Sequence, residues 1–209
     1  KLNQILFFNM FIWSSIAHLI ALTSPGPDTA VTIRQVSLYG RNAGIFTSIG
    51  IGVGIYIHCF LAINGISLFI LENELYKFSI SIIGSSYIFY LGISMLKSNS
   101  VNKYNQNNSQ NSSSIYGSFF SGLITNIFNV KAFIFFVSLF TILIDSIQGL
   151  FFHLYPIYFS ITSALWFMLV SYLLTSSKTI NIHKNKLINY FLSTILCFIG
   201  LFIFIKSIY

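Results

Sequence analysis

Two opposite charges, Asp28 and Lys131, lie beside long apolar stretches of a chain that is otherwise poor in charge. Hydrophobic residues make up 55% of the 209 positions and charged residues only 7%. A charge at membrane depth is unfavourable unless it is paired or hydrated, and such groups commonly serve ion, proton or substrate pathways. Asp28 can neutralise an ammonium or carry a proton, and also suits the first turn of the helix that follows Pro27. Lys131 can snorkel, pair with an acid or bind a carboxylate.

Two amides, Asn126 and Asn129, precede Lys131 and share one face of a helix because they are three residues apart. Amide side chains facing lipid would lack hydrogen-bond partners, so we expect both to point into the protein. Hydrogen bonding between helices and ligand contact explain them equally well. We therefore take Asn126, Asn129, Lys131 and Asp28 together as candidate substrate-binding residues.

The run Pro25-Gly26-Pro27 predicts a break at the end of the first apolar stretch. Proline has no N–H, so carbonyls near Ala21 to Thr23 lose their partners within the helix. In lipid, unpaired backbone is tolerated only where it is buried in protein or lines a wet cavity. The break either lines a substrate path or simply ends a helix.

Three other residues in the second apolar stretch are of interest. Gly50 and Gly54 form a small-xxx-small pair, which predicts close packing of a neighbouring helix. His58 lies deep in the same stretch, where it could act with Asp28 in a proton relay or be a hydrogen-bonded core histidine.

Stretches of about 20 apolar residues, the length needed to span a bilayer, cover most of the chain. The predicted fold is therefore an all-α membrane protein with six transmembrane helices. Three helices in each half require opposite orientations of the two halves, which predicts two inverted repeats with interrupted first and fourth helices. The predicted halves are residues 1–96 and 116–209, joined by a flexible polar loop at 97–115. The predicted spans are Ile5–Thr23, Gly44–Leu71, Tyr76–Leu96, Tyr116–Ile144, Phe152–Ser176 and Leu187–Ile205.

The net charge of +7 is interpreted as a topology signal rather than a nucleic-acid surface, because the cations lie between apolar runs. Loops rich in Lys and Arg stay cytoplasmic, and the predicted spans place eight cations on one side and three on the other. Both termini are therefore predicted outside the cytoplasm, and the segment from Leu2 onward is interpreted as a membrane helix rather than a signal peptide. The eight are Arg34, Arg41, Lys97, Lys103, Lys131, Lys178, Lys184 and Lys186; the three are Lys1, Lys77 and Lys206.

The two cysteines, Cys59 and Cys197, lie far apart inside apolar runs. They leave one alternative function, a membrane-embedded thiol redox carrier with a related three-plus-three architecture, which would need both thiols together. No His, Asp or Glu cluster predicts catalysis or a metal site, so we expect neither an enzyme nor a cofactor. A channel is disfavoured by the lack of a filter motif or an acidic ring.

The chain resembles the LysE/RhtB family of amino-acid exporters over essentially its whole length. The resemblance rests on Ser24-Pro25-Gly26-Pro27-Asp28, on Gly40-Arg41-Asn42-Ala43-Gly44, and on Gly50-Ile51-Gly52-Val53-Gly54 with His58. Gly84 through Tyr87 to Tyr90-Leu91-Gly92 looks like that family's third span. Gly117 or Gly122, followed by Asn126, Asn129, Lys131 and Ala132, is similar to its fourth.

This resemblance implies a multi-pass exporter of amino acids or close derivatives in the cell inner membrane, driven by the proton gradient. Its partners would be a small-molecule substrate and the lipid bilayer, while a homo-oligomer stays an open question. Val130 stands where the family usually has proline, which predicts a weaker kink, and Asp28 stands where asparagine is also common. Asp28 and Lys131 are predicted to face one cavity, to pair in the empty state, and to bind a zwitterion together.

Overall fold

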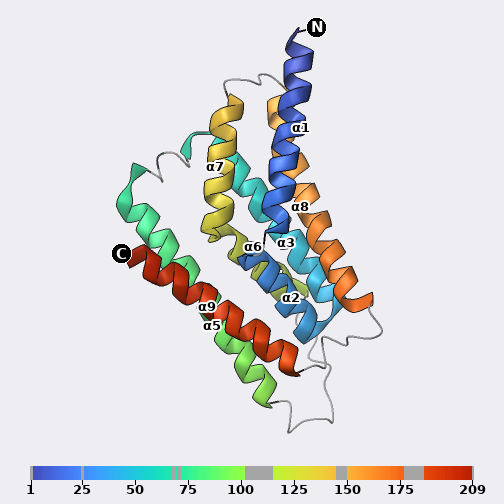
Figure 1. The fold of residues 1–209 in the computed structure, drawn as a ribbon, viewed down its shortest axis with the longest axis vertical. Helices are drawn as coiled ribbons and strands as arrows, with labels where there is room; N and C mark the ends of the chain where they lie inside the picture. The colour runs from blue at the N-terminus through green and yellow to red at the C-terminus, as the bar shows by residue number, and fades with distance from the viewer. Residues whose placement is uncertain are drawn as a thin grey trace.

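The computed structural model describes residues 2–24, 26–66, 69, 72–101, 115–144, 150–176 and 186–208, and these are all-helical, without a strand. Figure 1 shows the helices as an elongated bundle. Their bounds are α1 Leu2–Thr23, α2 Pro27–Tyr39, α3 Arg41–Ile63, α5 Glu74–Val101, α6 Ile115–Ile127, α7 Val130–Ile144, α8 Leu150–Ser176 and α9 Lys186–Ile208.

Among the described residues, two helices are long and apolar enough to cross a membrane: α3, and α8 over Leu154–Ser176. Helices α6 and α7 pass the same test together but are bent by 58° at their junction, so they count as a third candidate span if taken as one. This composition fits an all-α membrane protein.

Helix α3 is shorter than the predicted span Gly44–Leu71, because it ends at Ile63. Asn64 caps this end, with its side-chain amide donating to Phe60 O at 2.7 Å. Gly65 follows at φ +70°, a left-handed conformation that glycine adopts without strain and that commonly ends helices. The prediction of one continuous apolar span was therefore wrong at this end.

The polar loop predicted at 97–115 begins later than expected, because helix α5 continues to Val101. Ile115 already belongs to α6, and residues 102–114 lie outside the described residues.

Helix α2 lies between the first two predicted spans and is buried although it is polar. Arg34 is only 7% exposed and donates from Nη2 to Ser94 Oγ of α5 at 3.0 Å. This position corrects the interpretation of Arg34 as one of the loop cations that set the orientation. The buried residues of α2 are Pro27, Asp28, Val31, Thr32, Arg34, Gln35, Val36 and Ser37.

Helix α3 lies at the centre of the fold, where it packs against α6 and α8, while α5 and α9 run side by side as a second pair (Figure 1). The core is largely aromatic, with Phe136, Phe140 and Phe159 almost fully buried beside Ile51. Gly50 and Gly54 lie on the α6 side of α3: a Cβ at Gly50 would meet the backbone of Phe119, and one at Gly54 would meet the Asn126 side chain.

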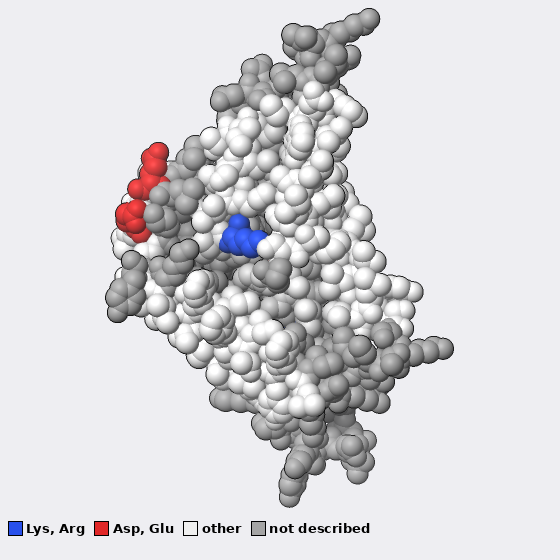
Figure 2. Space-filling view, in the orientation of Figure 1, with Lys and Arg blue, Asp and Glu red and all other residues white. Residues whose placement is uncertain are grey.

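The outer surface of the described residues is mostly apolar, and large hydrophobic side chains are exposed on every long helix. Figure 2 shows one face, on which basic atoms gather at a central place and acidic atoms lie at one edge. A surface of this kind suits lipid, because water-facing surfaces carry many more charges.

Candidate functional site

The first break separates α1 from α2. Helix α1 ends at Thr23, and Gly26 precedes α2 in an extended conformation with Pro27 as the first helical residue. Pro25 lies outside the described residues, but its identity alone removes the N–H that would otherwise bind the Ala21 carbonyl. A freed carbonyl is therefore expected at this place.

The second break separates α6 from α7 and forms without proline. Asn129 caps α7: its Oδ1 accepts from the backbone N–H groups of Lys131 at 3.1 Å and Ala132 at 3.4 Å. An asparagine in this position satisfies N–H groups that have no partner in the first helical turn. The 58° bend shows that Val130 in place of proline leaves a pronounced break.

The two breaks meet at the Asp28 carboxyl group. Asn126 Nδ2 donates to Asp28 Oδ2 at 2.8 Å, and Asn129 Nδ2 donates to the same oxygen at 2.9 Å. Asp28, Asn126 and Asn129 are buried, with 9%, 0% and 3% of their surface exposed. The second carboxyl oxygen, Oδ1, is buried and has no hydrogen-bond partner. The amides therefore hold the group in place and leave one oxygen available.

Lys131 binds the first break rather than the acid. Its Nζ donates to Ser24 O at 2.7 Å and to Ala21 O at 3.0 Å. No ion pair joins Lys131 to Asp28 in the part of the chain that the structure describes, so the direct pairing predicted for the empty state was wrong. The reason is local: two amides already occupy one oxygen of Asp28, while the carbonyls at the end of α1 offer the ammonium two acceptors.

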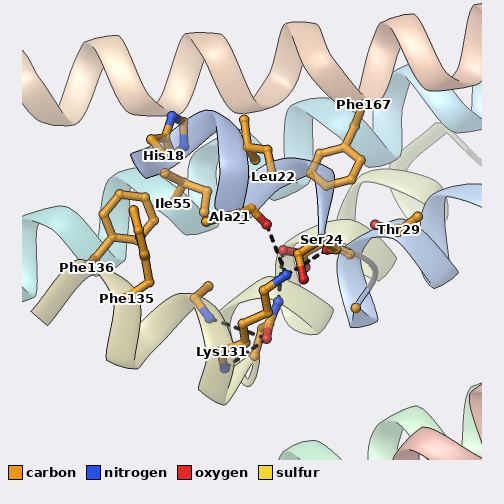
Figure 3. A pocket seen from close by; sticks show the side chains of 14 residues that line it. His18, Ala21, Leu22, Ser24, Thr29, Ile55, Lys131, Phe135, Phe136 and Phe167 are labelled. Atoms are coloured by element: carbon orange, nitrogen blue, oxygen red, sulfur yellow. Dashed lines mark hydrogen bonds between the residues drawn. The ribbon is translucent and has the colours of Figure 1, made fainter. Parts of the chain in front are cut away.

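Asp28 and Lys131 nevertheless line the same pocket, which holds about 410 Å³ of space including the solvent at its mouth. Figure 3 shows Lys131 reaching toward Ala21 and Ser24, with His18, Phe135 and Phe136 grouped to one side. Asn129 lines the pocket, whereas Asn126 lies behind Asp28 and is not part of the wall. The lining residues are His18, Ala21, Leu22, Ser24, Gly26, Asp28, Thr29, Ile55, Asn129, Lys131, Ala132, Phe135, Phe136 and Phe167.

His58 supports this site from behind. Its Nε2 donates to the backbone carbonyl of Asn126 at 2.8 Å, its Nδ1 is buried without a partner, and its ring packs against Phe133. Gly54 faces the same asparagine, since a Cβ there would lie 2.5 Å from Asn126 Oδ1. His58 and Gly54 therefore act on Asp28 only through Asn126.

Sequence reasoning missed His18, which is 1% exposed and lines the pocket beside the aromatic side chains. Its Nε2 lies 3.0 Å from Ser163 Oγ and its Nδ1 lies 3.5 Å from Thr162 Oγ1, both on α8. A lone histidine within the first apolar stretch was the available signal. The aromatic side chains gave no such signal, because the chain contains 23 phenylalanines.

Together, these features define a helical membrane protein in which two interrupted helix pairs enclose a pocket with separated acidic and basic groups. Discontinuous helices of this kind commonly form the substrate sites of secondary transporters. The family model described as LysE type translocator matches residues 19–207, and the chain belongs to this family. It is a family of membrane transporters and exporters, not of enzymes.

Relatives of the chain include proteins with a named transport activity. A threonine efflux protein of Salmonella typhi is 29% identical over 67% of this chain and 69% of its own length, and one of Escherichia coli is 28% identical over the same shares. An uncharacterized membrane protein of Bacillus subtilis, YrhP, is 27% identical over 55% of this chain. The match spans 58% of YrhP, less than two thirds of that relative. No solved structure matches the chain.

Proposed function

We propose that this protein is a secondary transporter that exports amino acids or close derivatives across the cytoplasmic membrane. One observation carries the proposal: a buried acid and a lysine from opposite halves of the chain line one pocket, at the place where both interrupted helix pairs meet. Membership of the LysE type translocator family and similarity to threonine efflux proteins support amino-acid export.

The pocket offers complementary groups for a zwitterion. The free Oδ1 of Asp28 is the acceptor for a substrate ammonium, and the amides on Oδ2 keep that oxygen oriented. Lys131 Nζ is the donor for a substrate carboxylate, which would replace the carbonyls of Ala21 and Ser24. Because the substrate then competes for contacts that hold α1 near α7, its binding would loosen the first break and favour a conformational change.

The order and packing of the helices support an architecture of six spans in two inverted repeats. Each half begins with a broken pair, α1 with α2 and α6 with α7, and continues with two long helices. The matching elements contact each other across the halves, since α3 packs on α8 and α5 packs on α9. A two-fold axis in the membrane plane would produce such pairings.

We further propose that export is coupled to the proton gradient and that Asp28 carries the proton. A carboxyl group held by amides through one oxygen can bind either a proton or a substrate ammonium at the other, which makes the two exclusive. His58 would affect this exchange through the Asn126 carbonyl that it contacts. The thiol redox alternative would instead need two thiols close together, and its candidates are the free cysteines Cys59 on α3 and Cys197 on α9.

We propose that the protein lies in the cell inner membrane, with both termini outside the cytoplasm. Helices long and apolar enough to span a bilayer support the location. Lys97 near the end of α5 and the cations at residues 178–186 support the orientation, because Lys and Arg near the ends of spans are more frequent on the cytoplasmic side.

Transport by purified protein in vesicles tests the proposal. Proteoliposomes are loaded with one labelled amino acid at a time from a panel, and for at least one amino acid the label should leave faster than from protein-free vesicles, at a rate that a pH gradient changes. Asp28→Asn keeps the shape of the side chain, so the protein should fold while the effect of the pH gradient is lost. Release that no amino acid and no gradient accelerates would contradict the function.

Lys131→Met tests the basic half of the site. It leaves the carbonyls of Ala21 and Ser24 without their donor and removes the partner of the substrate carboxylate. A charged hydrogen bond contributes about 1.5–3 kcal/mol, so affinity should fall by roughly 10- to 100-fold. Arg41→Met is the matched control, because Arg41 is exposed and contacts Thr175 and Tyr172 away from the pocket. Equal transport by both variants would remove Lys131 from the site.

A further inference from the structure

The pocket has a second end, lined by aromatic and aliphatic side chains rather than by charges. His18, Phe135 and Phe136 form this end, with Ile55 beside them (Figure 3). Their rings contact one another: the centroids of Phe135 and Phe136 are 5.0 Å apart, and that of His18 lies 5.8 Å from Phe136 and 6.1 Å from Phe135. We call these four residues the aromatic end.

The histidine in this end does not offer a free polar group to a ligand. Its Nε2 lies within hydrogen-bond distance of Ser163 Oγ, and its Nδ1 lies at the limit of that distance from Thr162 Oγ1. Thr162 Oγ1 itself donates to Tyr158 O, so it can only accept from the imidazole. Both ring nitrogens are thus directed toward α8, and the pocket meets the ring carbons.

We propose that the aromatic end selects amino acids with uncharged, predominantly apolar side chains and rejects lysine, arginine, aspartate and glutamate. This inference rests on the proposed function, in which Asp28 and Lys131 take the ammonium and carboxylate of the substrate. The substrate side chain then lies toward the aromatic end, because that wall adjoins the charged one in the same pocket.

The selection follows from desolvation. A charged side chain placed there would lose its water and find neither a counter-charge nor a hydrogen-bond partner among the ring carbons and the Ile55 side chain. An apolar side chain would instead bury surface against the rings. Between apolar side chains that differ by one methylene group, a hydrophobic pocket discriminates by only about 10- to 200-fold. The preference among apolar amino acids is therefore set by the size of the pocket.

Counterflow in proteoliposomes with a panel of labelled amino acids is the experiment. The wild-type protein should exchange leucine, methionine or phenylalanine and leave lysine, arginine and glutamate at the rate of protein-free vesicles. Exchange of lysine or glutamate as fast as leucine would overturn the inference while supporting amino-acid transport. Exchange of no amino acid would overturn the proposed function, and the inference with it.

Phe135→Ala tests the wall directly, and Ile134→Ala is its matched control. Phe135 is partly buried and lines the pocket, so its truncation enlarges the aromatic end without opening the core. Ile134 is the preceding residue on α7, is 47% exposed and does not line the pocket. Phe135→Ala should change the ratio of phenylalanine to leucine exchange by roughly tenfold or more in favour of phenylalanine, and Ile134→Ala should leave it unchanged. An unchanged ratio in both variants would contradict the assignment.

Discussion

Gly54→Ala should impair transport by displacing Asn126 from Asp28. The added Cβ would lie 2.5 Å from Asn126 Oδ1, 2.9 Å from its Cβ and 3.0 Å from its Cγ. Carbon atoms in contact lie about 3.5–4.0 Å apart, so the asparagine or its helix must withdraw by roughly 1 Å. A withdrawal of that size away from the acid would lengthen the 2.8 Å hydrogen bond beyond the range of a good one.

The size of the effect follows from these two losses. Overpacking a filled interface destabilises a protein by about 1–3 kcal/mol, and a hydrogen bond to a charged group contributes about 1.5–3 kcal/mol. We expect a lower midpoint of thermal unfolding in detergent and roughly 10- to 100-fold slower counterflow in proteoliposomes. The control is Gly117→Ala on α6, where a Cβ would have nothing within 4 Å and should favour the helix slightly.

A double variant separates packing from function. Gly54→Ala with Asn126→Ala removes the close contacts with Oδ1 and Cγ but keeps the one with Cβ at 2.9 Å, so thermal stability should recover only in part while transport stays impaired. If Gly54→Ala alone matches Gly117→Ala in both stability and transport, the reasoning that links Gly54 to the acid through Asn126 is refuted.

Three further predictions concern the breaks and the orientation. Asn129→Ala should lower the free energy of unfolding by about 0.5–2 kcal/mol and impair transport. Asn129→Asp retains the capping oxygen but replaces the amide donor to Asp28 by a second buried carboxylate, so it should also impair transport and lower stability. Equal stability of Asn129→Ala and the wild-type protein would contradict the capping role. Replacing Pro25 and Pro27 by Ala restores two N–H donors, and that of residue 25 would compete with Lys131 for the Ala21 carbonyl. The variant should insert normally but transport poorly at equal abundance, and normal export would contradict a role of the break. Single cysteines at Gln106 or His183, both outside the described residues, should resist an impermeant thiol reagent added to intact cells, and labelling there would reverse the proposed orientation.

The interrupted site was predictable from sequence because its causes are local. A proline removes its own N–H wherever the chain goes, so Pro25 alone predicts a freed Ala21 carbonyl, which the structure shows bound by Lys131. The spacing of Asn126 and Asn129 predicts one shared helix face, and this was wrong, because α6 ends at Ile127 and Asn129 caps α7. The expectation that both amides point into the protein agrees with the structure, where both donate to one carboxyl oxygen. The near absence of charge indicates a lipid environment without reference to any contact.

The tertiary structure decided which groups meet. Opposite charges at positions 28 and 131 predict an ion pair. In the structure, amide groups donate to the acid and the lysine donates to backbone carbonyls, because these partners are closer once the two breaks pack together. Arg34 reads as a loop cation, and only the packing of α2 against α5 buries it beside Ser94. His18 joins the pocket because α1 lies against α7 and α8. Residue type and periodicity describe one segment at a time, whereas these contacts depend on how separate helices pack, and that packing determines the site.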